Sequence, residues 1–281
     1  MYGGWRAPKN LWADMKTSIH DDSVAKSVGM RGGTIPGTIH LSLFAPLMLE
    51  IFGKRWFEKG SLSVYYTFAT THLEEVRAIV QIPPVEAKVV QVEARIEMPS
   101  GQVVATGTVA VGEPEELSYI QALELRSSKP EDLRILAGYK VGDELRSRDI
   151  LMTQEKVNKG LPAITDHLDY YKGKSPWGNS ILSPTAMYTV MALGGYTLDA
   201  KEIQAVPFYG ATEIQNINGP VLVGVPYKAT GKLVSVGVSN KTEYFWHDSF
   251  LKEKESGKLI ASMRHLNRFM KAGSPLYEDS K

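Results

Sequence analysis

The sequence repeats one order of elements twice, and this repetition is what most limits the folds open to the chain. A polar, glycine-rich loop leads into apolar residues 39–53, and a second such loop leads into apolar residues 185–195. Each apolar stretch has the length and amphipathic spacing of one buried helix, and Gly53 and Gly194 are its stop signals. The pattern therefore predicts two equivalent central helices.

Strand-like segments follow each predicted helix. They are rich in β-branched and aromatic residues, and the later ones alternate apolar with polar residues about a short turn. The order of helix, strands and hairpin occurs twice, which indicates a duplicated α+β unit. The paired strand-like segments are 61–82 and 211–233, and the paired hairpins are 87–111, with a turn at Ser100–Gly101, and 241–269, with a turn at Ser256–Gly257.

A charged, proline-punctuated connection separates the two units. We expect a first repeat over residues 1–125, a linker over 126–139 and a second repeat over 140–281. Early in the second repeat, Thr153 is placed to cap the N-terminus of a short helix.

Composition excludes several classes of protein. Lys and Arg number 32 against 31 Asp and Glu, a net charge of +1, which argues against nucleic-acid binding. Cysteine is absent, which excludes disulfides, thiolate–metal sites and a cysteine nucleophile. No apolar run approaches the roughly 20 residues of a membrane span, and the N-terminal segment lacks the apolar core of a secretory signal. These features favour a cytoplasmic protein without a membrane or nucleic-acid partner.

Residues 18–40 place acidic and imidazole side chains around a glycine-rich turn. Asp21 or Asp22 is expected to cap a short helix that stops at Gly29, which leaves His20 as a candidate acid or base. Adjacent His and Asp side chains point in different directions, and no HxH or HExxH spacing occurs, so we predict no metal site. Phosphate-loop and dinucleotide motifs are also lacking, and we expect no cofactor.

A resemblance to a known family enters at two segments. Residues 19–43 and 165–184 resemble the motif regions of MaoC-like enoyl-CoA hydratases and acyl dehydratases, in which a histidine, an acidic residue and a Gly/Pro turn precede the central helix. The resemblance and the repeat together imply a double hot-dog fold. In it, each repeat wraps a curved antiparallel sheet around a long central helix, the helices pack side by side, and the sheets join.

The resemblance also implies an acid–base site, but here each repeat keeps only one of its two residues. In the family an Asp and a His share one water molecule and move a proton to or from the substrate α-carbon. The first repeat keeps His20, but the position five residues earlier is Met15, and the nearest carboxylate is Asp14. The second repeat keeps Asp166, but five residues later stands Tyr171. A loop shift could let Asp14 serve His20, the Tyr171 phenol could replace the imidazole, or both sites have decayed after duplication.

Further residues are candidates for binding. The amides of Gly37 and Thr38, at the start of the first helix, would polarise a thioester carbonyl. His40 is either a pocket wall or a core residue. Tyr170 and Trp177 form either an apolar pocket or part of the core. We expect His72, His247 and His265, which fall in strand-like segments, to be structural, because no carboxylate lies at a useful spacing from them.

The resemblance thus implies a hydratase or dehydratase acting on an acyl thioester carried by CoA or a carrier protein, with Asp166 and Tyr171 favoured as the working pair. One alternative is a hot-dog thioesterase in which Asp166 or Asp169 activates water. A second is a non-catalytic acyl-binding or structural protein. The sequence leaves open a homodimer.

Overall fold

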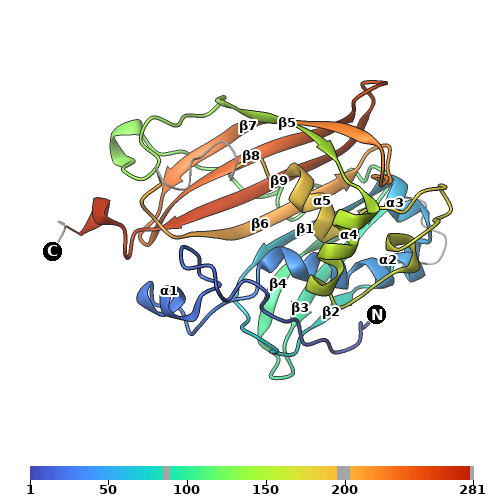
Figure 1. Cartoon of the computed structure of the whole chain (residues 1–281), viewed down its shortest axis with the longest axis horizontal. Coiled ribbons are helices and arrows are strands. Elements are labelled where there is room, and N and C mark those ends of the chain that lie inside the picture. Colours follow the sequence, from blue (N-terminus) through green and yellow to red (C-terminus); the bar gives the residue numbers. More distant parts are fainter. Residues whose placement is uncertain (85–88, 195–202, 279–281) are drawn as a thin grey trace.

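The computed structural model describes residues 1–84, 89–194 and 203–278. Its framework is one nine-stranded sheet in the order β2-β3-β4-β1-β6-β9-β8-β7-β5, and neighbouring strands are antiparallel. The sheet is strongly twisted, with the central helices on one face (Figure 1). The strands of the first repeat are β1 Gly60–Tyr66, β2 Arg77–Val80, β3 Val90–Glu97 and β4 Val103–Val111. Those of the second are β5 Glu144–Leu151, β6 Pro207–Asn216, β7 Pro226–Val238, β8 Thr242–Glu253 and β9 Leu259–Met270.

The two repeats meet where β1 pairs with β6. This antiparallel register runs from Ser61 opposite Gln215 to Tyr65 opposite Ala211. Since β1 also pairs with β4 on its other side, it is hydrogen-bonded along both edges. The two predicted sheets are therefore one continuous sheet.

Both predicted hairpins are present. Strands β3 and β4 pair across the turn that contains Gly101, and β8 and β9 pair across the turn that contains Gly257. These glycines have φ angles of 84° and 71°, a left-handed conformation that costs glycine little and other residues more. Local turn chemistry therefore defines these two connections, as the sequence indicated.

The first central helix is interrupted, in contrast to the single helix predicted. It consists of the 3₁₀ helix η1, Gly37–Leu43, followed by the α-helix α2, Ala45–Phe52. Pro46 lies in the first turn of α2, and because it has no N–H it cannot continue the hydrogen bonds of a preceding α-helix. The chain ends α2 at Gly53, as predicted, and α3 follows at Arg55–Lys59.

The second central helix, α5, spans Pro184–Met191. Ser183 caps it by accepting a hydrogen bond of 3.2 Å from the Ala186 amide. Proline is favoured in this first turn because the amide it lacks would have no partner within the helix. The helix ends at Met191, before the predicted stop at Gly194.

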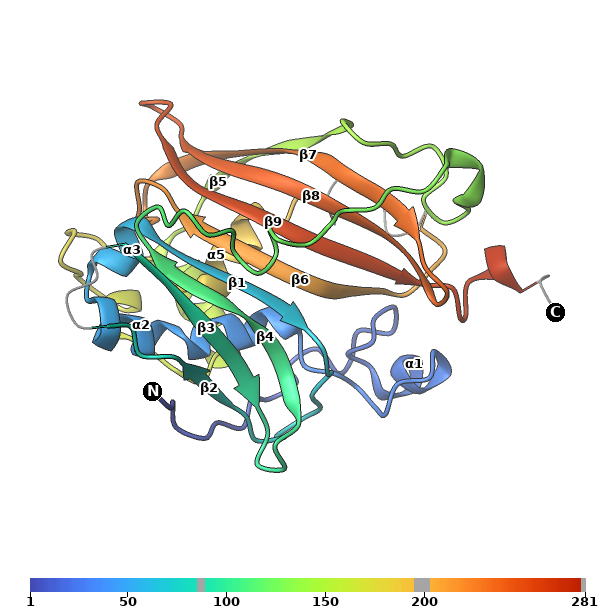
Figure 2. The ribbon, with the colours of Figure 1, turned by 180° about the vertical axis from the view of Figure 1, so that it is seen from behind.

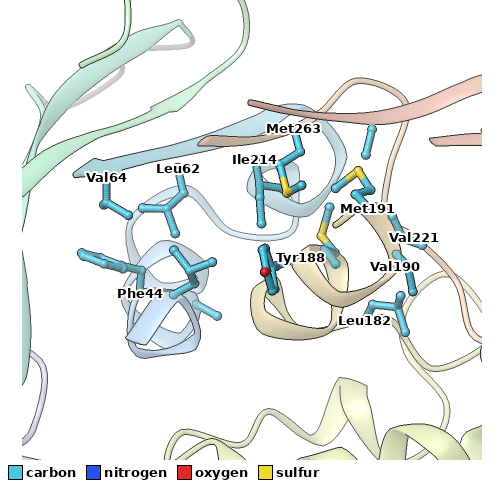
Figure 3. Packing of buried hydrophobic residues seen from close by; sticks show 14 of the residues in the cluster. Phe44, Leu62, Val64, Leu182, Tyr188, Val190, Met191, Ile214, Val221 and Met263 are labelled. Atoms are coloured by element: carbon cyan, nitrogen blue, oxygen red, sulfur yellow. The ribbon is translucent and has the colours of Figure 1, made fainter. Parts of the chain in front are cut away.

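The two central helices lie side by side against the sheet. Thr185 on α5 donates to the Thr38 carbonyl at 2.9 Å, and its hydroxyl lies 2.7 Å from that of Ser42 on η1. Figure 3 shows Phe44 and Tyr188 projecting from the two helices toward a shared apolar layer. A fully buried side chain such as Phe44 stabilises the fold by roughly 1.5–3 kcal/mol through removal of apolar surface from water.

Short helices occupy the loops. Asp21 caps α1, accepting hydrogen bonds from the amides of Ser23 at 2.9 Å and Val24 at 3.1 Å, and Thr153 caps α4. Both caps agree with the sequence prediction. The bounds are α1 Asp22–Ser27, η2 Pro130–Asp132, α4 Gln154–Gly160, η3 Leu161–Ala163, η4 Asp169–Tyr171 and η5 Pro275–Tyr277.

The connection between the repeats crosses the face of the sheet opposite the helices (Figure 2). Ile120 is fully buried there against Trp246 and Leu266, and the carboxylate of Glu213 accepts a hydrogen bond from Gln121 at 2.9 Å. Both faces of the sheet are therefore covered at its centre. The repeat boundaries at residues 125 and 140 stay a prediction. Over the described residues, no helix is long and apolar enough to cross a membrane.

Candidate functional site

A pocket of about 250 Å³ lies at the junction of the repeats. We call it the seam pocket. It is lined by residues of the 18–40 loop, by residues 66–70 at and beyond the end of β1, by Val104 on β4, and by residues 207–209 at the start of β6. It holds His20, Gly37 and His40 of the predicted site, together with Tyr66 and Tyr209. No carboxylate lies among the described residues that line it.

The His20 imidazole is held in one orientation. Its Nδ1 lies 2.8 Å from the carbonyl oxygen of Thr34, and because a carbonyl only accepts, Nδ1 carries the proton. Nε2 of the neutral ring is then left with a lone pair. Burial lowers the pKa of His20 below its ordinary value of 6.5, although the bond to Thr34 opposes this effect. At neutral pH the side chain is therefore an unprotonated base.

The 18–40 loop owes its shape to capping and to one amide side chain. Asn10 donates from Nδ2 to the His20 carbonyl at 2.8 Å, which ties the N-terminal segment to the loop. Asp21 is used as the helix cap, and Asp22 pairs with Lys26 at 2.6 Å. The two aspartates thus have local structural roles, and His20 is the member of this group that reaches the pocket.

Asp14 is not bound to His20. It is exposed, and none of the hydrogen bonds or ion pairs between described residues joins it to the imidazole. The partner that the sequence offered for His20 is accordingly replaced by the Thr34 carbonyl, a neutral acceptor.

His40 lies on η1 and is buried, yet it also lines the seam pocket. Its Nε2 is 2.9 Å from the Thr70 hydroxyl, whereas Nδ1 is buried without a hydrogen-bond partner among the described residues. Burial lowers the pKa of His40 to about 4, so the ring is neutral at physiological pH. Both interpretations offered by the sequence, pocket wall and core residue, describe part of its position.

Gly37 and Thr38, the first two residues of η1, have different surroundings. A Cβ on Gly37 would lie 3.1 Å from ring atoms of Tyr66, a tight contact that the tyrosine ring would have to shift to relieve. Thr38 is buried and accepts from Thr185 through its carbonyl, and it is not among the residues lining the pocket. Of the two amides, that of Gly37 is the one at the pocket.

Tyr66 and Tyr209 were not predicted, and they bring the two repeats together at the pocket. Tyr66 ends β1 and Tyr209 lies near the start of β6. The Tyr66 hydroxyl donates to the Thr212 hydroxyl at 3.0 Å, and burial raises the pKa of the Tyr66 phenol, which therefore stays neutral. The sequence pattern predicted strand-like segments at 61–82, which includes Tyr66, and at 211–233, which begins after Tyr209. It carried no information on which strands pair across the repeats.

Asp166 lies in a different pocket, of about 200 Å³, which also contains Arg6 and Glu50. We call this the Asp166 pocket. The Arg6 guanidinium donates to Asp166 Oδ1 from Nε at 3.0 Å and lies 2.9 Å from it through a second nitrogen. This ion pair occupies the carboxylate that sequence analysis favoured as a catalytic group. The two pockets share no lining residue within the part of the chain that the structure describes.

Tyr171 is fully buried near Asp166. Its hydroxyl has no hydrogen-bond partner in the described part of the chain, and burial together with the Asp166 charge raises its pKa. Tyr171 lines neither pocket. The two residues favoured as a working pair are therefore neighbours in space without a hydrogen bond between them.

Tyr170 and Trp177 belong to an aromatic cluster beside α3. Each makes an edge contact with Phe57, with ring centroids 6.2 Å and 5.9 Å away, and their own centroids are 5.9 Å apart. Trp177 also donates from its indole nitrogen to Glu58 at 2.8 Å. Neither ring lines the seam pocket or the Asp166 pocket, which fits the packing alternative.

Metal-ligating side chains are scattered. Across residues 1–84, 89–194 and 203–278, no three His, Asp or Glu side chains converge in a way that could hold a metal ion.

Comparison with known proteins places this geometry in a fold. No protein-family model matches the chain, and no curated protein matches its sequence. Among solved structures, a MaoC domain protein described as a dehydratase, from Chloroflexus aurantiacus J-10-fl, is similar over 96% of this chain and 94% of its own, with a TM-score of 0.60 at 8% identity. A conserved hypothetical protein of Mycobacterium tuberculosis, described as a double hot-dog fold, is similar over 95% and 96%, with a TM-score of 0.57 at 10% identity. The chain has the double hot-dog fold.

The predicted fold class is thereby confirmed, while the comparisons leave chemistry open. A third solved structure, described as an oleoyl thioesterase from Lactobacillus plantarum, is similar over 96% of this chain and 96% of its own, with a TM-score of 0.50 at 10% identity. Structures described as a dehydratase and as a thioesterase thus share the double hot-dog architecture with this chain. Function has to be argued from the side chains of its own pockets.

Proposed function

We propose that the seam pocket binds an acyl thioester and that His20 moves the proton in hydration of an enoyl group or the reverse dehydration. The observation that carries the proposal is the fixed neutral imidazole: Nδ1 is bound to Thr34 at 2.8 Å, and Nε2 is left as a base within a pocket. Around it, apolar side chains such as Ile35, Phe68 and Phe208 suit an acyl group.

A single residue, His20, can carry out both proton transfers of the proposed reaction. As the oxygen of a water molecule bonds to the β-carbon, His20 Nε2 takes one of its protons, and the resulting imidazolium returns a proton to the α-carbon. The Thr34 carbonyl stabilises the transient positive charge on the ring. The Gly37 amide is proposed to polarise the thioester carbonyl, and the support for this role is that Gly37 lines the pocket at the start of η1, where the first amides of a helix lack partners within it.

The residues that line the seam pocket support hydratase activity better than thioesterase activity. The thioesterase alternative needs a carboxylate to activate water, and the described lining of the seam pocket includes none. Asp166, which could serve, is paired with Arg6 in the other pocket. CoA or a carrier protein would supply the acyl group.

The test uses the purified full chain and crotonyl-CoA. Loss of the enone absorbance without release of free thiol is the expected result. Thiol release without hydration would instead establish a thioesterase. Saturable binding of crotonyl-CoA with neither reaction would establish the non-catalytic acyl-binding role.

A further inference from the structure

A chain of buried polar groups runs from the seam pocket into the second repeat. Tyr66 lines the pocket and donates to Thr212 on β6 at 3.0 Å. The Thr212 hydroxyl lies in turn 2.9 Å from Nδ1 of His265 on β9. Thr212 and His265 are both completely buried, so solvent does not satisfy either group.

The same imidazole supports the second tyrosine of the pocket. The ring of Tyr209 packs against His265 in an edge contact, with centroids 5.1 Å apart. Tyr188 on α5 completes the cluster, with centroids 5.0 Å from His265 and 5.3 Å from Tyr209. One histidine that lines neither pocket therefore contacts Tyr209 directly and Tyr66 through one hydroxyl.

Packing alone does not account for this arrangement. A buried imidazole and hydroxyl have to be desolvated, and apolar residues of similar size fill such space at lower cost. The two hydrogen-bond contacts that join Tyr66, Thr212 and His265 Nδ1 do something that apolar residues do not, since they fix the orientation of the groups they join, while His265 Nε2 is buried without a partner among the described residues. Of the joined groups, the one that reaches the pocket is the Tyr66 phenol.

His265 is unsuited to storing a proton. Burial, and then the neighbouring His247 in register across the β8–β9 pair, hold the pKa of His265 well below its ordinary value. The imidazole therefore stays neutral while it holds Thr212. Its role follows from its hydrogen bond and ring contacts rather than from a change of charge.

We propose that His265 is a positioning residue that acts through Thr212 to fix the Tyr66 phenol. The Tyr66 oxygen, whose hydrogen is given to Thr212, then forms a polar wall with Tyr209 and accepts a hydrogen bond from a hydroxyl group of the bound acyl chain. The identity of the ligand rests on the proposed function above. The positioning of Tyr66 does not, and it can be measured without turnover.

The first measurement is spectroscopic. In protein labelled with 3-fluorotyrosine, the Tyr66 fluorine signal is assigned from its loss in Tyr66→Phe. Thr212→Val keeps the side-chain shape but removes the hydroxyl, and we expect it to shift or broaden the Tyr66 signal. Thr212→Ser keeps the hydroxyl and should leave that signal near its original position.

The second measurement is kinetic. With 3-hydroxybutyryl-CoA, the hydroxyl-bearing substrate of the reverse dehydration, Thr212→Val should lower kcat/KM about tenfold, mainly through KM, the effect expected from the loss of one oriented hydrogen bond. Thr212→Ser should stay within about threefold of the unsubstituted protein, because the conservative change rescues the contact.

Ser249→Ala is the matched control, because Ser249 is equally buried and its hydroxyl has no hydrogen-bond partner among the described residues. An unmoved Tyr66 signal in folded Thr212→Val overturns the proposal, as does an equal shift in Ser249→Ala. A moved signal in a protein that never hydrates crotonyl-CoA supports the positioning role while rejecting the proposed function.

Discussion

The seam pocket and the Asp166 pocket give the two candidate bases different electrostatic conditions. In the seam pocket, His20 is neutral, and its Nδ1 is bound to the Thr34 carbonyl, which leaves the Nε2 lone pair for proton exchange. In the Asp166 pocket, Asp166 is bound by the Arg6 guanidinium, and the nearby Tyr171 phenol is sealed in the core. A base is needed for the proposed chemistry, and both oxygens of the Asp166 carboxylate already accept hydrogen bonds, Oδ1 from Arg6 and Oδ2 from Thr165.

The difference shows how one site of a duplicated pair can change while the fold is kept. Each repeat retains one residue type of the dyad found in the family that the chain resembles. What differs is the partner: a backbone carbonyl orients His20, whereas a side chain from the N-terminal segment neutralises Asp166. The identity of a motif residue therefore predicts less than the group bound to it.

The comparison is tested most strongly by substituting each of the two candidate bases in turn. We expect His20→Ala to lower the hydration rate of crotonyl-CoA by about two to four orders of magnitude, the usual contribution of a general acid–base group. Asp166→Asn should stay within a few-fold of the unsubstituted rate. Steady-state kinetics on both folded variants decides, and the opposite ranking would move the chemistry to the Asp166 pocket.

The second-largest effect is expected from acid, which should destabilise both repeats. The pKa values of His40, in the first repeat, and His247, in the second, are lowered to about 4 from 6.5 by burial. The unfolded chain therefore binds protons more readily, so stability is full above about pH 6.5 and falls as the pH is lowered toward 4, by on the order of 3 kcal/mol for each histidine. Urea unfolding at a series of pH values measures the loss, and His40→Gln and His247→Phe should each flatten it. An unchanged slope in both variants would contradict the assignment.

A smaller effect separates two glycines. Gly37→Ala should destabilise the protein by about 1–3 kcal/mol and displace Tyr66, because the added Cβ would meet the ring at 3.1 Å. Gly160→Ala, at the end of α4 where nothing lies within 4 Å, is the control and should stabilise by about 0.4–1 kcal/mol. Thermal unfolding of both variants checks this. Equal effects would show that the Tyr66 contact does not require a glycine.

The smallest expected change is at Tyr171. Because its buried hydroxyl has no partner among the described residues, Tyr171→Phe should leave stability within about 1 kcal/mol of the original, or raise it. Tyr66→Phe should cost more, since it removes the donor to Thr212. Chemical denaturation of both variants makes the test. A large loss at Tyr171 would indicate a bound water molecule or another partner for its hydroxyl.

Features determined by nearby residues could be predicted from the sequence. The turns at Gly101 and Gly257 and the caps at Asp21 and Thr153 depend on a few consecutive residues. The double hot-dog fold was predicted from the repeated order of helix, strands and hairpin, together with the resemblance of residues 19–43 and 165–184 to the MaoC-like family. The break at Pro46 could also have been foreseen, because the missing amide is evident in the sequence.

Features that depend on distant contacts could not. Nothing near Asp166 indicates that Arg6 will reach it, and nothing near Tyr66 indicates that β6 will supply Thr212. His265 was expected to be structural because carboxylate spacing was the criterion applied, whereas its partner is a threonine hydroxyl on another strand. The seam pocket is made by such pairings, so its full composition appears only in three dimensions.

The β1–β6 pairing has a consequence for folding cooperativity. The walls of the seam pocket come from both repeats, and the register from Ser61 opposite Gln215 to Tyr65 opposite Ala211 holds them together. Neither repeat can unfold alone without breaking that register and dismantling the pocket. A ligand present at one hundred times its Kd would therefore protect the entire chain by about 2.7 kcal/mol in a single transition, with no independently melting half.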